Sequence, residues 1–172
     1  MARKAVFIVA LCLVLWQTPA MAIRMVDQVK GVFLYNFIHF VKWEKQPQTP
    51  NICLTAPKDF AQVMKHIAKE KSKSDKSEFT LSYIEDLEKD VTDCDLFYLS
   101  SERAEIWHLN HTNYDMGKTI LITDDQDLFD KYADVYLYES DSRIKLKVYH
   151  SRIKEREMRL SAKLLRLAEE VR

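Results

Sequence analysis

The residues of this sequence that could do chemistry are its cysteines, its five histidines and one cluster of carboxylates. Cys53 or Cys94 beside a histidine would resemble a thiol nucleophile with its base, but neither lies in a local signature of such enzymes. His108 and His111 are three residues apart in a predicted helix and could face one metal ion, but no third ligand stands at a fixed offset. A solvated helix face explains the two histidines better, so no metal and no cofactor is predicted.

Three carboxylates follow one predicted strand, in the segment Thr123-Asp124-Asp125-Gln126-Asp127. The C-terminal ends of parallel strands commonly hold ligands, so Asp124 and Asp125, with Ser100 and Ser101 after a neighbouring strand, are a candidate small-molecule pocket. The calcium-loop pattern fails, because no glycine follows and the twelfth position is a valine. Capping of the next helix by Asp124 or Asp125 is the simpler interpretation of the cluster.

An aromatic row on the predicted N-terminal helix is a candidate surface for binding another protein. Tyr35, His39 and Trp43 recur at four-residue steps, and the opposite side of this helix already carries enough apolar residues for a core. Partly exposed aromatic side chains on a rigid helix are good interface anchors. Burial of both sides of the helix in a layered fold is an equally good alternative.

Basic side chains near the C-terminus form a second candidate surface. Arg143 and two lysines alternate with apolar residues along one predicted strand, and Arg152, Arg159 and Arg166 follow. Such a row of basic side chains could bind an acidic partner, although it is more often the solvent-exposed side of a strand or helix. For partner binding we select Arg143, Arg159 and Arg166, together with the aromatic row.

Residues 1–22 have the three parts of a secretory signal peptide. A charged pair, Arg3-Lys4, precedes an apolar run over 5–16, and Ala20-Met21-Ala22 supplies small residues at the peptidase site. The run is about a dozen residues, whereas a bilayer-spanning helix needs roughly 20, so a permanent anchor is the poorer interpretation. Cleavage would leave residues 23–172 as one domain in the periplasm, with no direct membrane insertion.

Composition narrows the function of this mature chain. Loss of Arg3 and Lys4 leaves 24 basic against 26 acidic residues, a net charge of −2, so the basic excess of nucleic-acid-binding proteins is missing. The chain has 2 glycines, Gly31 and Gly117, which is too few for most phosphate-binding loops and nucleophile elbows. We therefore predict a binding protein with no enzymatic activity and no nucleic-acid partner.

The leader takes Cys12 with it, and the mature chain then has one possible cysteine pair, Cys53 and Cys94. An exported protein with two cysteines favours a disulfide, and two buried reduced thiols are the alternative. If the bond forms, it closes a loop of 94 − 53 = 41 residues, for which chain entropy predicts about 4 kcal/mol of stabilisation.

Alternating strands and helices predict an α/β fold, a three-layer sandwich with a mainly parallel five- to six-stranded sheet, an antiparallel edge hairpin and helices on both faces. The strands are expected over 51–56, 79–84, 96–99, 120–122, 135–138 and 143–149. The helices are expected over 26–43, over 60–67, from 101 onward, after a cap at Asp124 or Asp125 so as to include 128–129, and over 160–171. A bond between Cys53 and Cys94 would make strands 51–56 and 96–99 neighbours, as in a doubly wound sheet of order 2-1-3.

Four segments, in this order, resemble those of the YfiR-like family of periplasmic proteins. They are the first helix, Lys30-Gly31-Val32-Phe33-Leu34-Tyr35-Asn36-Phe37-Ile38-His39-Phe40-Val41-Lys42-Trp43; the first strand, Asn51-Ile52-Cys53-Leu54; the strand and turn Asp93-Cys94-Asp95-Leu96-Phe97-Tyr98-Leu99-Ser100-Ser101-Glu102; and the closing helix, Leu160-Ser161-Ala162-Lys163-Leu164-Leu165-Arg166-Leu167-Ala168. The match covers nearly all of the mature chain.

This resemblance implies a periplasmic α/β protein, commonly a homodimer, that represses a membrane-bound diguanylate cyclase by occupying its periplasmic domain. Release of the cyclase raises cyclic-di-GMP and favours biofilm. The resemblance also implies a structural disulfide at Cys53 and Cys94. A periplasmic small-molecule binding module, with its pocket near Ser100, Ser101, Asp124 and Asp125, is the alternative function.

Overall fold

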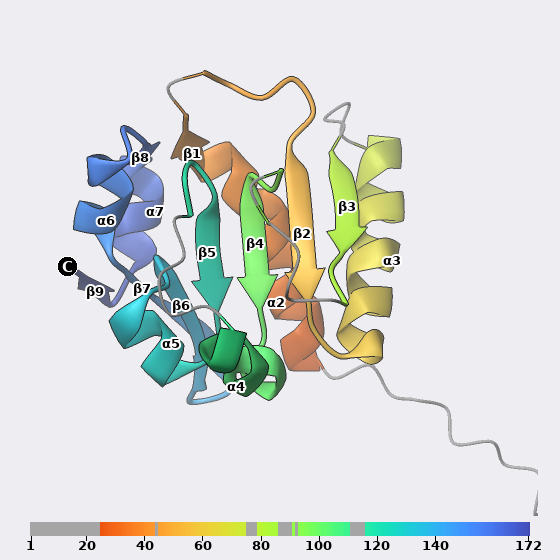
Figure 1. The fold of residues 1–172 in the computed structure, drawn as a ribbon. Coiled ribbons are helices and arrows are strands. Elements are labelled where there is room, and N and C mark those ends of the chain that lie inside the picture. Colours follow the sequence, from red (N-terminus) through yellow and green to blue (C-terminus); the bar gives the residue numbers. More distant parts are fainter. Residues whose placement is uncertain (1–24, 44, 75–78, 86–90, 92, 111–115) are drawn as a thin grey trace, which may run out of the picture.

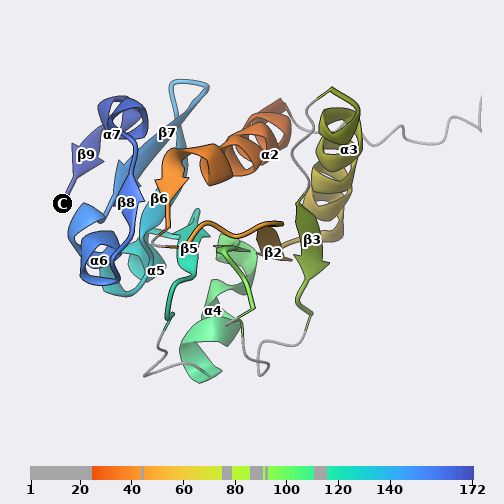
Figure 2. The same ribbon diagram turned by 90° about the horizontal axis from the view of Figure 1, so that it is seen from above.

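The computed structural model describes residues 25–43, 45–74, 79–85, 91, 93–110 and 116–172 (Figure 1). The predicted signal peptide, residues 1–22, lies outside the described residues. Helices cover both faces of a central sheet, and Figure 2 shows the three layers edge-on. The predicted fold class is therefore confirmed.

The central sheet has seven described strands in the order β3-β2-β4-β5-β6-β7-β9. Their bounds are β2 (Asn51–Thr55), β3 (Thr80–Tyr83), β4 (Leu96–Leu99), β5 (Ile120–Thr123), β6 (Val135–Ser140), β7 (Arg143–Val148) and β9 (Glu170–Val171). The strands from β3 to β6 are parallel, β6 and β7 form an antiparallel hairpin, and β9 runs parallel to β7. All six predicted strands are present, and β2 lies between β3 and β4 as the 2-1-3 order requires.

Helices α2 (Met25–Phe37) and α3 (Lys58–Ser74) pack on one face of the sheet, while α4 (Ser101–Asn110) and α5 (Gln126–Lys131) pack on the other (Figure 2). Every residue of β4 and β5 is buried, because successive side chains enter opposite cores. In β5, Ile120 and Ile122 face the α2–α3 side and Leu121 faces the α4–α5 side. This two-sided burial explains the unbroken apolar runs of these strands.

The β6–β7 hairpin is built by a two-residue turn, as the polar tetrad at 139–142 predicts. Asp141 and Ser142 have φ values of 52° and 58°, the left-handed conformation that a tight hairpin turn requires at both central positions. The alternation along β7 places Leu146 and Val148 in the core. The hairpin does not end the sheet, however, because β9 lies beyond β7.

The N-terminal helix is shorter than predicted. Helix α2 ends at Phe37, the 3₁₀ helix η2 (Ile38–Phe40) follows, and β1 (Val41–Lys42) then pairs antiparallel with β8 (Arg159–Leu160). The amide of Ser161 donates to the carbonyl of Phe40 at 2.8 Å. This pairing joins segments about 120 positions apart, so the local helical pattern did not reveal it.

The C-terminal segment was predicted as one helix over 160–171, and this is wrong. After α6 (His150–Glu155), which was not predicted, the chain forms β8, then α7 (Ala162–Leu167), and then β9. Ser161 caps α7, and the backbone becomes extended at Ala168. The amides of Glu169 and Arg172 then donate to β7 carbonyls, each at 2.9 Å, and this strand pairing replaces the last helical turn.

Helices α2 and α3 approach closely at Gly31. A Cβ atom there would lie 2.6 Å from Ile67 Cδ1 and 3.1 Å from Met64 Sδ. Both side chains are buried, so neither can move without disturbing the core. Gly31 therefore allows the contact between the two helices.

We predict that Gly31→Ala and Ile67→Val are energetically coupled. Ile67→Val alone should lower the free energy of unfolding by about 1 kcal/mol. It also removes Cδ1, the atom that the methyl group introduced by Gly31→Ala would strike. In the Gly31→Ala background, the loss caused by Ile67→Val should therefore be about 1 kcal/mol smaller. A double-mutant cycle by urea denaturation measures this coupling. Ile120→Val, a buried change in β5, is the control and should be additive with Gly31→Ala; additivity of both pairs would contradict the prediction.

Candidate functional site

The predicted disulfide between Cys53 and Cys94 is present and joins the centre of the sheet. The two Cα atoms are 5.7 Å apart, Cys53 lies in β2, and Cys94 precedes β4. Both side chains are buried in the core on the α4–α5 side. Asn51 holds the same junction, because its amide N–H donates to Asp95 Oδ2 at 2.7 Å and its side-chain nitrogen donates to the Asp93 carbonyl at 2.9 Å.

We predict that Cys53→Ala/Cys94→Ala lowers the free energy of unfolding by about 4 kcal/mol, the chain entropy of a 41-residue loop. Urea denaturation with and without a reductant measures the loss. The urea midpoint of the wild-type protein should fall when reductant is added, and the urea midpoint of the double variant should not change. A wild-type midpoint that reductant leaves unchanged would show that the bond does not stabilise the fold.

A small-molecule pocket was predicted at the C-terminal strand ends, where the structure places Asp124 directly after β5. Lys30 of α2 donates to Asp124 Oδ2 at 2.6 Å, and the amide of Ser101, the first residue of α4, donates to Oδ1 at 2.7 Å. Burial raises the pKa of Tyr98 well above its usual range, and the Asp124 carboxylate that its hydroxyl contacts raises it further. Because the Asp124 carboxylate accepts from the N-terminus of α4 beyond the C-terminal ends of the strands, it lies where a doubly wound sheet would bind an anion.

The other predicted members of this pocket lie beside Asp124. Asp125 caps α5, accepting from the amide of Leu128 at 2.7 Å, so the capping interpretation is confirmed for this residue. The hydroxyl of Ser100 is buried and has no hydrogen-bond partner among the described residues. Asp124 is thus held by residues of the chain itself and ties α2 to the sheet.

We predict that Asp124→Ala costs about 2 to 4 kcal/mol, because it leaves the half-buried ammonium of Lys30 and the amide of Ser101 without their acceptor. Chemical denaturation at neutral pH measures the loss. Asp127→Ala, in the exposed first turn of α5, is the matched control and should cost under about 1 kcal/mol. Equal losses for the two variants would contradict the tethering role of Asp124.

The aromatic row is not an exposed surface, which corrects the expectation behind it. Tyr35 is 1% exposed and Trp43 is 8% exposed, whereas His39 is exposed. Tyr35 packs edge-on against Phe79, with ring centroids 5.3 Å apart. Trp43 is buried in the core because α2 ends at Phe37, so Trp43 follows strand β1 and is not part of the helix. The alternative of burial on both sides of the helix therefore holds for Tyr35 and Trp43.

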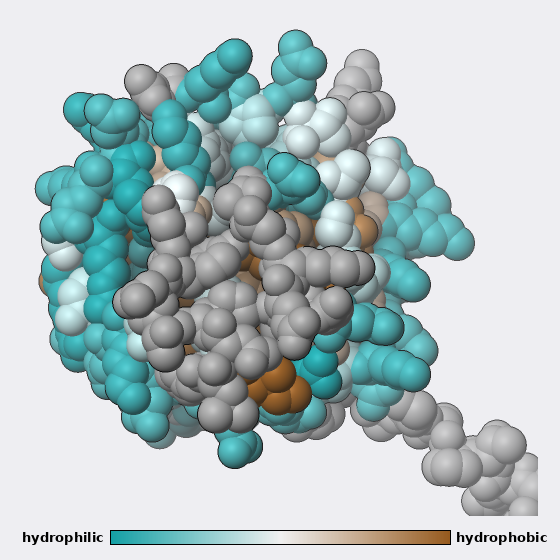
Figure 3. Space-filling model, in the orientation of Figure 1, coloured by the Kyte–Doolittle hydropathy of each residue, from teal (hydrophilic) through white to brown (hydrophobic). Residues whose placement is uncertain are grey.

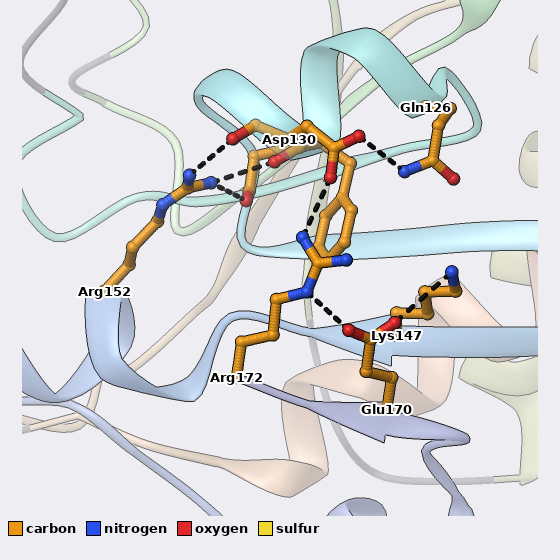
Figure 4. A network of polar contacts seen from close by, with 8 residues as sticks. Gln126, Asp130, Lys147, Arg152, Glu170 and Arg172 are labelled. Carbon is orange, nitrogen blue, oxygen red and sulfur yellow. Dashed lines mark hydrogen bonds and ion pairs between the residues drawn. The ribbon is translucent and has the colours of Figure 1, made fainter.

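The two lysines of β7 are paired with carboxylates of the C-terminal segment, whose flank, at the left of Figure 3, is mainly hydrophilic. Lys145 contacts Glu169 at 2.7 Å and Lys147 contacts Glu170 at 3.3 Å. In Figure 4, Arg172 points between Asp130 and Glu170, which its guanidinium contacts at 2.9 and 2.5 Å. Charge on this flank is thus largely neutralised within the chain.

Arg143, Arg159 and Arg166, the arginines selected for partner binding, are all exposed. Arg143 begins β7 beside the hairpin turn, Arg159 lies in β8 of the separate two-stranded sheet, and Arg166 lies in α7. Figure 1 shows β8 near the top of the view and the hairpin turn near the bottom. The three arginines therefore do not converge on one spot, and their role in partner binding remains a prediction.

A ladder of aromatic rings on β6 and α5 was missed at the sequence level. Tyr136 stacks on Tyr138 and on Phe129, with centroids 5.0 and 5.6 Å apart, and Phe129 contacts Tyr149 at 5.3 Å. The Tyr138 hydroxyl donates to Glu169, which raises the pKa of Tyr138 to about 12. The alternation Val135-Tyr136-Leu137-Tyr138 was the available signal, because it places both tyrosines on the same side of the strand.

The described residues contain no group of three or more His, Cys, Asp or Glu side chains that could hold a metal ion. His111 lies outside the described residues, and His108 lies in α4. No helix in the described part of the chain is long and apolar enough to cross a bilayer.

Comparison with protein families matches residues 27–169 to the family described as YfiR/HmsC-like. The chain belongs to this family. The match begins in α2 and ends just before β9, so it includes both cysteines, Asp124 and the β6–β7 hairpin. No protein of curated function matches the chain.

Among solved structures, the chain is similar to the crystal structure of a conserved domain protein from Vibrio cholerae O1 biovar El Tor str. N16961, with a TM-score of 0.53 and 10% sequence identity. The alignment covers 86% of this chain and 60% of that one, so this chain spans less than two thirds of its relative. The similarity supports the three-layer fold.

Proposed function

We propose that this YfiR/HmsC-like chain is a non-catalytic regulator that is exported by residues 1–22, binds the periplasmic domain of a membrane-bound diguanylate cyclase, and represses it. The family match over residues 27–169 carries the proposal. Such a regulator shifts the cyclase between states by its difference in affinity for them. A disulfide at the centre of the sheet suits this role, because a binding surface gains affinity from a rigid support.

An exposed apolar stripe on α2 is the surface that we propose for the partner. Met25, Val29 and Val32 are 79%, 46% and 40% exposed, and their spacing puts them on one side of the helix. Clusters of exposed apolar side chains commonly mark protein interfaces. His39 lies further along the same segment and extends the proposed surface.

We propose that the exposed arginines contribute charge recognition at separate places on the surface. Arg143, Arg159 and Arg166 make no ion pair with the described carboxylates, unlike Lys145 and Lys147 of the same region. A partner with acidic residues would therefore find these three cations available. Exposed charges of this kind affect association rate and its salt dependence more than final affinity.

Deletion of the gene in its native host tests the regulatory proposal. Cellular cyclic-di-GMP should rise, and the exported protein should co-purify from membranes with a cyclase under oxidising conditions. Recovery of the protein alone, together with unchanged cyclic-di-GMP after deletion, would overturn the proposal.

Charge introduction on α2 tests the proposed surface. Val29→Asp should leave the fold intact but reduce co-purification of the cyclase about tenfold or more, because it places a carboxylate in an apolar interface. Ile106→Asp is the matched control, since Ile106 is 41% exposed on α4, on the other side of the sheet. Equal co-purification by the two variants would exclude the α2 stripe.

Size-exclusion chromatography of the same two variants tests the predicted homodimer. If Val29→Asp abolishes dimers while cyclase binding persists, the stripe joins two copies of this chain instead of the partner.

A further inference from the structure

A pocket of about 280 Å³ opens between α4, the end of α5 and α6, away from the α2 stripe. Its apolar lining comes from Trp107 on α4, Met116 before β5, and Tyr132 at the end of α5. A volume near the lower end of the range of ligand sites, about 300–1,000 Å³, suits a small metabolite. Flat aromatic walls favour a ligand that has a planar apolar body.

The polar lining of this pocket is predominantly basic. Among the described lining residues, Lys131, Arg152 and Arg156 contribute three positive charges, and Asp134 and Glu155 contribute two negative ones, so their formal sum is +1. Asp134 is 1% exposed and is already engaged with Arg156. The charge that faces an incoming ligand is therefore positive.

Arg156 is held in place before any ligand arrives. Its guanidinium donates to Asp134, to the Thr119 carbonyl at 2.6 Å and to the Arg152 carbonyl at 3.2 Å. Asp134 in turn accepts from the amide of Leu121 at 2.9 Å, which fixes the carboxylate to β5. Burial raises the pKa of Asp134, and Arg156 opposes that shift. The pair is thus anchored to the central sheet.

Arg152 is held equally firmly, but without a carboxylate among its described partners. It donates to the carbonyls of Ala133 at 2.6 Å, Phe129 at 2.9 Å and Asp130 at 2.9 Å, as Figure 4 shows. Its guanidinium lies 3.6 Å from the ring centroid of Tyr149. The hydrogen bonds to the three carbonyls use three of the five N–H groups of the guanidinium. The two N–H groups that are left can still donate to a carboxylate.

We propose that this pocket binds a small organic anion, whose carboxylate contacts Arg152, Arg156 and Lys131 while its planar body packs on Trp107 and Tyr132. Charge-assisted bonds from pre-oriented guanidinium groups orient the anion, and the apolar wall selects against inorganic ions. The inference does not depend on the proposed function, because it requires no partner protein.

Titration of the full mature protein with benzoate tests the inference. The melting temperature should rise with benzoate concentration and saturate, with half-saturation near about 1 mM or below. The indole N–H signal of Trp107 should shift along the same curve, while that of Trp43 stays fixed. Benzyl alcohol, which lacks the charge, and inorganic phosphate, which lacks the apolar body, should each bind at least about tenfold more weakly.

Lys131→Glu and Lys154→Glu form the matched pair of variants. Both side chains are exposed, but Lys131 lines this pocket and Lys154 lines a separate hollow beside His150. Lys131→Glu should weaken benzoate about tenfold, and Lys154→Glu should leave its affinity unchanged. Absence of a saturable shift, a stronger effect of Lys154→Glu, or equal binding of phosphate would overturn the proposal.

Discussion

The covalent bond between Cys53 and Cys94 sets the arrangement of this molecule. It joins β2 to the entry of β4, which are the two strands at which the chain reverses direction across the sheet. Every other described strand of the central sheet adds to one side or the other of this pair. The bond also lies in the core on the α4–α5 side, so α4 packs over a junction that cannot separate. A fold with 2 glycines and mostly short strands gains a fixed centre from it.

Much of the sheet could be predicted from the sequence, because its central strands are buried on both faces and therefore appear as short unbroken apolar runs. The observed bounds of β4, Leu96–Leu99, equal the predicted ones, and the observed bounds of β5, Ile120–Thr123, differ from the predicted ones by one residue. The alternating pattern of β7 and the polar tetrad at 139–142 likewise identified the hairpin. These elements are specified by local sequence, so local patterns were sufficient.

The two ends of the described chain could not be predicted in the same way. Residues 41–43 and 159–171 carry helical periodicity, yet they form strands where they meet partners distant in sequence. The aromatic row failed for the same reason, since Trp43 points into the core once β1 replaces the helix. The contact between Lys30 and Asp124 could not be predicted either, because a lysine on α2 carries no local sign of contact with the end of β5.

The pairing of β1 with β8 has a consequence for biogenesis. A chain that crosses the inner membrane from its N-terminus delivers Val41 long before its partner Leu160. The cysteines, by contrast, are 41 residues apart and can be oxidised while the rest of the chain is still in transit. Contacts between segments distant in sequence form slowly. The oxidised folding intermediate therefore lacks the β1–β8 pairing after α2 until the C-terminal segment arrives. If the chain is exported as proposed, periplasmic chaperones and proteases compete for it during that interval.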